Sequence, residues 1–183
     1  MTPEAVAAAV VSALQALVGL PYDGEPVDQL QHALQCAHHA RRDGADPELV
    51  LAALLHDVAR SPDVDGEPYD SGPLDHGRQG ARWLEPLLGD RVAWLAGAHV
   101  SAKRYLVAAE SGYASGLSPV SAHTLRAQGS AMNAAERAAF ESHPHWRDAV
   151  RLRRWDDLAK DPGADVPGLE AYRPDLLRVA AER

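Results

Sequence analysis

The sequence predicts an all-α protein, and three observations carry that prediction. Alanine, leucine, arginine and aspartate dominate the composition, whereas β-branched and aromatic residues are sparse and phenylalanine occurs once. Such a composition favours helix over strand. Apolar residues recur at helical spacing between Pro and Gly residues that mark helix ends. No stretch alternates apolar and polar residues for long enough to predict a strand.

The first half of the chain is expected to contain three helices and one long loop. Gly19 ends the first helix, and a proline near the start of the second suits its first turn. The loop is rich in Pro, Gly and Asp, and long loops in small domains are often functional. The predicted elements are a helix over 3–18, a turn over 21–25, a helix from Pro26 to about Arg42, a helix over 47–58 and a loop over 60–75.

The second half is expected to be helical as well. Ser118 followed by Pro119 is typical of a helix start, with the serine as the capping residue. Two consecutive helices either run together or bend near Val100. The predicted elements are helices over about 76–88, 90–100 and 101–110, a short helix after Ser118, helices near 133–142 and 145–160, and a short C-terminal helix after a Pro- and Gly-rich stretch over 162–174.

Length and charge restrict the class of protein. A chain of 183 residues predicts one domain, residues 1–183. The formal net charge of −8 argues against a nucleic-acid binder that works by neutralising phosphates. The single cysteine, Cys36, fits a reducing cytoplasm and is expected in the core. No apolar run is long enough to span a membrane, and the N-terminal helix lacks a basic leader. We therefore expect a cytoplasmic protein.

The stretch "LVLAALLHDVAR" (49–60) places an imidazole and a carboxylate where a core is being built. A buried Asp is costly unless it is paired, hydrogen-bonded or bound to a cation. Imidazole and carboxylate together suit iron, manganese or zinc, and one Asp can bridge two ions. The candidate ligands lie on separate predicted helices or at their ends: His32, His56, Asp57, His76, His99 and either Asp156 or Asp157.

Each of these residues also has a simpler interpretation when it is taken alone. A lone histidine on a helix is usually a surface or core residue. The "WDD" segment could be a solvated face paired with Arg153, Arg154 and Lys160. The joint order is what favours a metal site. The remaining histidines are expected to have no ligand role: His38, His39, His123, His143 and His145.

The order H…HD…H…H…D, which covers residues 32–157, resembles the HD-domain superfamily. Most members of that superfamily are metal-dependent phosphohydrolases. The resemblance implies a compact helical bundle with a mono- or dinuclear metal site between its helices. Many members follow the HD pair with a hydrophobic residue, Gly and a His or Lys. Here "HDVAR" has Arg60 at the last of these positions, which retains anion binding and puts a proton-transfer role in doubt.

Three segments are similar to one branch, the phosphonate-degrading HD-domain oxygenases related to myo-inositol oxygenase: "YDGEPVDQLQHALQCA", "AHVSAKRYL" and "LRRWDDLAKD". The branch implies a mixed-valent Fe(II)/Fe(III) pair and dioxygen as co-substrate. We choose Asp156 as the distal ligand because a single Asp follows an aromatic residue in myo-inositol oxygenase; Asp157 stays open. The implied ligands are His32, His56, Asp57 and Asp156 for one iron, and Asp57, His76 and His99 for the other.

The same resemblance implies further site residues. Tyr22 and Glu25 match a latch and a removable iron ligand that precede the first ligand helix, on a turn that Gly24 makes mobile. From the residues alone, Glu25 could simply favour the helix start electrostatically, with Tyr22 packed on it. The implied phosphonate-binding residues are Lys103, Ser121 and Gln128, with Arg60 as a further cation; a solvated lysine and a helix hydroxyl are the simpler interpretations of the first two.

The resemblance thus implies an enzyme that cleaves the carbon–phosphorus bond of a small 1-hydroxyphosphonate with dioxygen, releasing phosphate and a carboxylate. The main alternative is an HD-type phosphohydrolase acting on a nucleotide or another phosphate ester. A non-catalytic metal-binding module is a third, which the complete ligand set disfavours. The sequence leaves open whether the substrate carries an amino or a trimethylammonio group or is another anion. It fixes neither the iron valence nor the oligomeric state.

Overall fold

The computed structural model describes residues 1–22, 24–64 and 76–183. Within these ranges the chain forms helices and one isolated bridge, between Pro21 and Asp28, but no strand, so the all-α prediction is confirmed. The helices are α1 (Pro3–Gln15), α2 (Gln29–Arg42), α3 (Pro47–Leu55), α4 (His76–Leu88), α5 (Asp90–Gly97), α6 (His99–Ala109), α7 (Pro119–Ala127), α8 (Ala134–Glu141), α9 (Trp146–Leu158) and α10 (Arg173–Ala181), with 3₁₀ turns at Val58–Arg60, Tyr113–Gly116 and Leu169–Tyr172.

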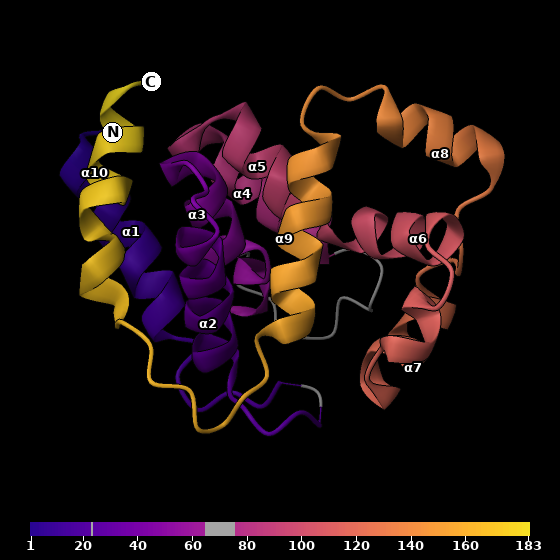
Figure 1. Cartoon of the computed structure of the whole chain (residues 1–183). Coiled ribbons are helices and arrows are strands. Elements are labelled where there is room, and N and C mark those ends of the chain that lie inside the picture. Colours follow the sequence, from indigo (N-terminus) through magenta and orange to yellow (C-terminus); the bar gives the residue numbers. More distant parts are fainter. Residues whose placement is uncertain (23, 65–75) are drawn as a thin grey trace.

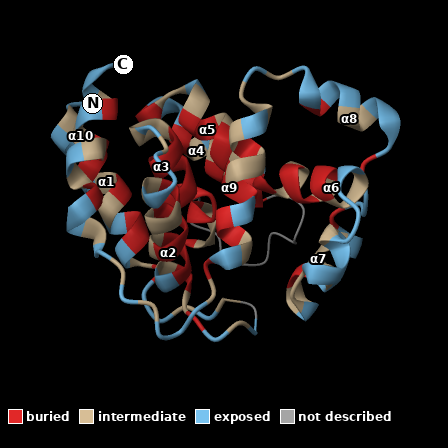
Figure 2. Ribbon diagram, viewed as in Figure 1, coloured by how far each residue is buried: buried red, intermediate tan, exposed pale blue. Residues whose placement is uncertain are grey.

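Helix α3 lies at the centre of the bundle, and α2, α5 and α9 pack around it (Figure 1). Helices α1 and α10 lie side by side at one end, so the two termini are neighbours. Helices α6, α7 and α8 form the opposite end, and α6 packs on α9. Buried residues concentrate on the central helices, whereas α7 and α8 are largely exposed (Figure 2).

The sequence of α3 explains its central place. Its run "LVLAALL" is apolar on every side, and each residue from Leu49 to Leu55 is at most 2% exposed. A helix that is hydrophobic all round must be covered on all sides. Asp46 caps its start, with the side chain accepting a hydrogen bond from the Leu49 N–H (3.2 Å). The helix therefore carries its last residues, and His56 after them, into the interior.

Arg91 of α5 ties three helix starts together. Its guanidinium contacts Asp46 (2.7 Å) and Glu48 (2.8 Å) at the start of α3 and Asp148 (3.1 Å) in the first turn of α9. These charge-assisted contacts are partly shielded from water, since the Arg91 side chain is 21% exposed. The shared cation fixes the mutual position of the central helices at the end remote from the segment 56–60.

Several element boundaries differ from the sequence prediction. Helix α2 begins at Gln29 rather than Pro26, because Asp28 and Gln31 form a reciprocal capping box with bonds of 2.7 and 3.0 Å. Helix α3 ends at Leu55, so Asp57 adopts a non-helical conformation (φ −106°) before the 3₁₀ turn. The bend between α5 and α6 falls at Ala98 rather than Val100, which makes His99 the first residue of α6.

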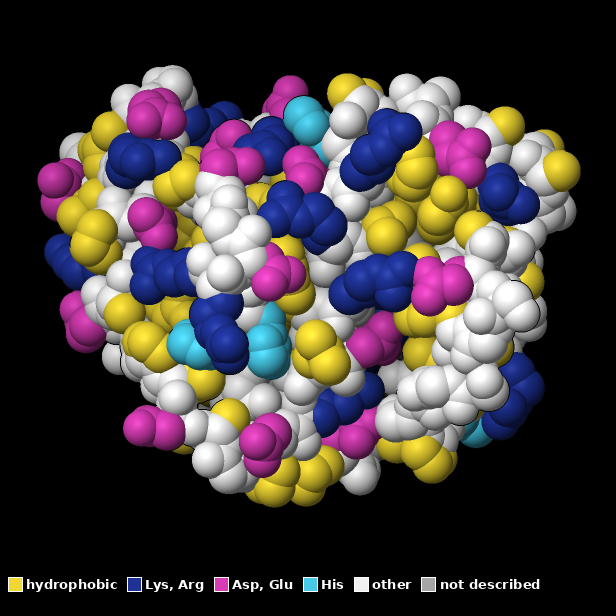
Figure 3. All heavy atoms as spheres, in the orientation of Figure 1, with side chains coloured by type: hydrophobic (Ala, Val, Ile, Leu, Met, Phe, Trp, Pro, Cys, Tyr) yellow, Lys and Arg dark blue, Asp and Glu magenta, His cyan; other side chains and the backbone are white. Residues whose placement is uncertain are grey.

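Most of the predicted loop over 60–75 lies outside the described residues, which end at Val64 and resume at His76. No helix in the described ranges is long and apolar enough to cross a membrane. On the face shown in Figure 3, acidic and basic side chains are interspersed. Cys36 is fully buried, as expected for a core residue.

The two leucines of α9 test the orientation of this helix. Leu152 is fully buried and Leu158 is 63% exposed. Leu152→Ala should lower the free energy of unfolding by about 2–5 kcal/mol, because it removes buried methyl groups and leaves a cavity. Leu158→Ala should stay within about 0.5 kcal/mol of the parent. Urea unfolding measures both, and equal losses would contradict the packing of α9 described here.

Candidate metal centre

Six side chains from five segments meet in the interior, and we call them the histidine–aspartate cluster. None is more than 6% exposed. One lies in the middle of α2, two follow the end of α3, one begins α4, one begins α6, and one lies in the last turn of α9. In that order they are His32, His56 with Asp57, His76, His99 and Asp156.

Backbone carbonyls fix the tautomer of three of the rings. The Nδ1 atom of His32 lies 2.8 Å from the Ala159 carbonyl oxygen. His56 and His99 each direct Nδ1 to the carbonyl three residues earlier, at 2.8 and 2.7 Å. A carbonyl only accepts, so each Nδ1 must carry the proton. The three Nε2 atoms then present bare lone pairs to the cluster, which is the form that binds a metal.

Burial favours the neutral form of the His32, His99 and His76 rings. It lowers the pKa of His32 to about 4 and that of His99 to about 3, although nearby carboxylates act in the opposite direction. The pKa of His76 is lowered for the same reason. Neutral imidazoles are available as ligands near pH 7 without first losing a proton.

The ring nitrogens face one another in two pairs. His32 Nε2 lies 3.1 Å from His56 Nε2, and His76 Nε2 lies 3.0 Å from His99 Nε2. In the first pair both nitrogens are unprotonated, so nothing within the pair relieves the repulsion of the lone pairs. A cation between or beside them would do so.

Asp57 stands between the two pairs. Its Oδ2 lies 3.5 Å from His56 Nε2, and its Oδ1 lies 3.3 and 3.6 Å from the Nε2 atoms of His76 and His99. The pKa of Asp57 lies below its usual range: burial alone would raise it, and the positive charge of Arg60 acts in the opposite direction. The buried Oδ1 has no hydrogen-bond partner among the described residues. An ionised, unsatisfied buried carboxylate of this kind calls for a cation.

The donor set fits metal ions. Two groups can each hold one ion, His32–His56–Asp57 and Asp57–His76–His99, and within each group the ligand atoms lie within 4.8 Å of one another. The groups share Asp57, with one oxygen directed to each. Imidazole nitrogen and carboxylate oxygen are ligands of first-row transition metals. The donor set is thus a candidate metal site, in which each of the two groups could hold one ion.

Asp156 faces the cluster and Asp157 does not. Asp156 Oδ1 lies 3.5 Å from His32 Nε2, and Oδ2 lies 4.0 Å from His56 Nε2. Asp157 instead accepts hydrogen bonds from Arg153 and, at 2.5 Å, from the Tyr113 hydroxyl. The side chains of α9 thereby assign the two adjacent carboxylates to different surroundings.

Arg153 is a buried residue that the sequence suggested only as a partner of a solvated face. It is 4% exposed, and it donates to Asp156 Oδ2 (2.6 Å), to Asp157 and to the Tyr113 hydroxyl (3.2 Å). Burial would raise the pKa of Asp156, but the guanidinium of Arg153 holds it well below its usual range. Arg153 therefore keeps Asp156 ionised and fixes its orientation.

Tyr22 lies against the cluster. Its ring stacks on His32, with centroids 3.9 Å apart, and its hydroxyl donates to Asp156 Oδ1 at 3.4 Å. Burial, followed by the charges of Asp156 and Asp57, raises its pKa well above the usual value, so the hydroxyl keeps its proton. Tyr22 thus contacts two members of the histidine–aspartate cluster, His32 and Asp156.

Glu25 lies on the other side of the same turn. Its Oε1 accepts a hydrogen bond from the Ser118 hydroxyl (2.6 Å) and lies 3.3 Å from Lys160 Nζ. The Glu25 N–H donates to the Tyr22 carbonyl (2.8 Å), so the two residues are linked by a tight turn. The turn thus brings one residue to the histidine–aspartate cluster and the other to the N-terminus of α7.

The predicted anion-binding residues lie near α7. Lys103, Ser121 and Gln128 are all buried, at 3%, 9% and 6% exposure. Lys103 Nζ donates to Thr124 Oγ1 at 3.0 Å, and burial lowers its pKa to about 8. Arg60 is half-buried and acts electrostatically on Asp57, Tyr22 and His76.

Two residues near α7, Thr124 and Lys160, were not assigned a functional role from the sequence. Thr124 follows Ser121 by one turn of α7, so helical spacing could have found it. Lys160 was seen only as a partner for "WDD", but its Nζ lies 3.2 Å from Ser121 Oγ and 3.4 Å from Ser118 Oγ. No spacing rule links a residue after α9 to the start of α7.

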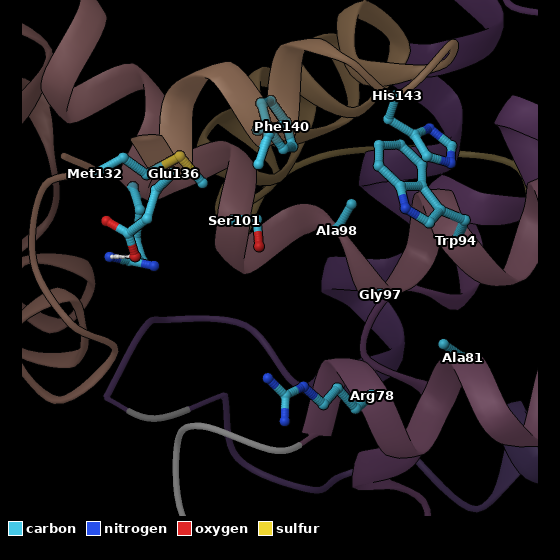
Figure 4. A pocket seen from close by; sticks show the side chains of 12 residues that line it. Arg78, Ala81, Trp94, Gly97, Ala98, Ser101, Met132, Glu136, Phe140 and His143 are labelled. Carbon is cyan, nitrogen blue, oxygen red and sulfur yellow. Dashed lines mark hydrogen bonds and ion pairs between the residues drawn. The ribbon is translucent and has the colours of Figure 1, made fainter. Parts of the chain in front are cut away.

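A separate cavity of about 480 Å³ lies between α4, α5, α6 and α8 (Figure 4). Trp94, Phe140 and His143 line it, and the rings of Trp94 and His143 stack with centroids 3.4 Å apart. The wall also includes Gly97 and Ala98, which directly precede His99. None of its lining residues belongs to the histidine–aspartate cluster.

Comparison with known proteins agrees with this geometry. The family profile described as "HD domain" matches residues 30–129, a range that contains His32, the adjacent His56 and Asp57, His76 and His99. The chain belongs to the HD-domain family.

Two relatives place it within that family. The chain is 39% identical over 161 residues to hydroxymethylphosphonate dioxygenase of Gimesia maris, covering 86% of this chain and 80% of the relative. It is 33% identical over 160 residues to [1-hydroxy-2-(trimethylamino)ethyl]phosphonate dioxygenase (glycine-betaine-forming) of Leisingera caerulea, covering 86% and 82%. The resemblance to phosphonate-degrading HD-domain oxygenases that was inferred from sequence motifs is confirmed.

Two glycines set the distance between α4 and α5, and with it the position of His76 relative to His99. A Cβ atom on Gly77 would lie 2.9 Å from the Gly97 carbonyl oxygen and 3.5 Å from His99 Cε1. Gly77→Ala should therefore push α4 away and weaken metal binding by Asp57, His76 and His99, while the group formed by His32, His56 and Asp57 keeps its ion. Metal analysis of the purified, metal-saturated variant measures this loss.

Gly80→Ala is the matched control on the same helix. Its new Cβ would make ordinary contact with Val58 Cγ1 at 3.5 Å, so metal content should match that of the parent. Both substitutions raise helix propensity similarly. Full metal content in Gly77→Ala, or equal losses in both variants, would contradict a role of the Gly77–Gly97 contact in positioning His76.

Proposed function

We propose that this protein is a di-iron oxygenase that cleaves the carbon–phosphorus bond of a small 1-hydroxyphosphonate with dioxygen. The hydroxyl-bearing carbon leaves as a carboxylate and phosphorus leaves as phosphate, with dioxygen as the oxidant. The observation that carries the proposal is Asp57, a buried carboxylate with one oxygen directed to each of two histidine pairs. One domain, residues 1–183, would carry the complete site.

The comparisons support this function over the phosphohydrolase alternative. Both relatives named above are dioxygenases of phosphonates, and each matches more than four fifths of this chain. A metal site and use of dioxygen are common to that branch. We propose that the metal is iron, in the mixed Fe(II)/Fe(III) state. The nitrogen and carboxylate donor set suits it.

The ligand assignment follows the geometry of the histidine–aspartate cluster. His32, His56, Asp57 and Asp156 would hold one iron, and Asp57, His76 and His99 the other. Bound iron would supply a Lewis-acidic, redox-active centre for dioxygen and for the substrate hydroxyl. The protein keeps the His32, His56 and His99 rings in the Nδ1–H tautomer through backbone carbonyls and keeps Asp156 ionised through Arg153.

The substrate anion would bind between the cluster and α7. Lys103 Nζ, Ser121 Oγ and the Gln128 amide offer donors to the phosphonate oxygens, with Arg60 as a further cation. The burial of Lys103 strengthens such contacts because less water competes. Tyr22 would hold the His32 ring in place by stacking on it. Glu25 would act as a removable ligand that occupies the open iron position when no substrate is bound.

The decisive experiment uses hydroxymethylphosphonate as the simplest 1-hydroxyphosphonate. Protein loaded with iron under anaerobic conditions should release phosphate from it only after oxygen is admitted. A nucleotide and a simple phosphate ester, incubated with and without oxygen, serve as controls for hydrolysis. Oxygen-independent release of phosphate from the esters, with the phosphonate left intact, would establish the phosphohydrolase alternative instead.

Lys103 predicts a pH dependence of substrate binding. Its amine is charged below its pKa of about 8 and becomes neutral above it, so the Michaelis constant for the phosphonate should rise above about pH 8, approaching tenfold per pH unit. Below that pH the cation is present and binding is retained. Steady-state assays from about pH 7 to about pH 9.5 measure this profile.

Lys103→Arg is the matched control, because a guanidinium remains charged throughout this range. Whatever its absolute affinity, the variant should lose the rise in the Michaelis constant near pH 8. A parent whose Michaelis constant is flat through this range, or an Arg variant with the same rise, would show that Lys103 does not carry the charge that binds the phosphonate.

A further inference from the structure

Both lysines of the chain contact side chains at the start of α7. The sequence contains only Lys103 and Lys160. Lys103 Nζ, from α6, donates to Thr124 at 3.0 Å, and Lys160 Nζ, from the segment after α9, donates to Ser121 at 3.2 Å. Lys160 thus contacts Ser121 of the proposed anion site from a different segment than Lys103, although the proposed reaction has given it no role.

Lys160 also forms an ion pair with Glu25. Lys160 Nζ lies 3.3 Å from Glu25 Oε1, and the two side chains are 13% and 12% exposed. Ser118 adds a second donor to the same oxygen at 2.6 Å, and its hydroxyl in turn accepts the Ser121 N–H at 3.1 Å as the cap of α7. Glu25 is therefore held by a cation and a hydroxyl at the α7 side of its turn.

The turn that carries Glu25 also reaches the metal site. Tyr22 stacks on His32 and donates to Asp156, and the Glu25 N–H is bonded to the Tyr22 carbonyl. The backbone of Glu25 thus lies one tight turn away from a residue that touches two members of the histidine–aspartate cluster. The same turn thus carries one side chain to the cluster and another to α7.

We propose that Lys160 is a positioning residue that holds Glu25 in a withdrawn position and so sets how often the Glu25 carboxylate occupies the metal site. This inference rests on the proposed function, because it assumes that Glu25 is a removable metal ligand. The physical reason is a competition between two cationic partners for one carboxylate. Loss of the Lys160 charge-assisted contact should shift the balance toward the metal by roughly tenfold.

The test is the rate at which the reduced iron centre of the holoenzyme is oxidised in air without substrate, followed by its optical spectrum. Lys160→Met should slow this oxidation roughly tenfold, because Glu25 would cover the open position more of the time. Lys160→Arg keeps the cation and should behave like the parent. If the Met variant does not fold, Lys160→Gln removes the charge with a polar side chain and is measured in the same way.

Glu25→Ala provides the background that separates this role from a structural one. In that variant oxidation should be fast, and adding Lys160→Met should change it little, because the carboxylate that Lys160 controls is gone. Oxidation of Lys160→Met at the parental rate, equal slowing in both backgrounds, or loss of iron from the Met variant would each overturn the proposal. Phosphate release from hydroxymethylphosphonate by the parent enzyme tests the proposed function independently, so the two can fail separately.

Discussion

The structure is organised around one buried carboxylate. Asp57 is enclosed by three histidine side chains, its two oxygens face different pairs of rings, and Oδ1 has no hydrogen-bond partner among the described residues. Such a charge is tolerated in a folded protein only when cations compensate it. Because burial favours the neutral form of the His76 and His99 rings, metal ions are the natural compensation, and folding and metal binding are expected to be linked.

The ends of the helices position the histidines around Asp57. His56 follows α3, His76 begins α4 and His99 begins α6, so three ligand-type residues stand at helix termini rather than within helices. A terminal position leaves backbone carbonyls nearby to accept the Nδ1 protons of His56 and His99. The break at Ala98 thus makes the His99 ring both available and oriented. The all-apolar α3 anchors this region by burying every residue before His56.

The residue order of the cluster could be read from the sequence because histidine and aspartate are rare in cores and their joint order is distinctive. The helices could be read from apolar spacing, Pro and Gly. What the sequence did not reveal depends on contacts between distant segments. Asp156 faces the rings of His32 and His56 whereas Asp157 binds Tyr113, and Lys160 forms an ion pair with Glu25. The start of α2 was misplaced because the capping box at Asp28 outweighed the preference of Pro26.

The turn between α1 and α2 contacts both the histidine–aspartate cluster, through Tyr22, and the start of α7, through Glu25. Its backbone is tied at both ends: Pro21 bridges to Asp28, Gln29 donates to the Pro21 carbonyl at 3.1 Å, and Glu25 donates to Tyr22. Gly24, with φ +85°, supplies the left-handed backbone conformation that the turn needs. These bonds link Tyr22, which stacks on His32, to Glu25, which pairs with Lys160 and Ser118, so the contacts at the cluster and at α7 are joined through one short backbone segment.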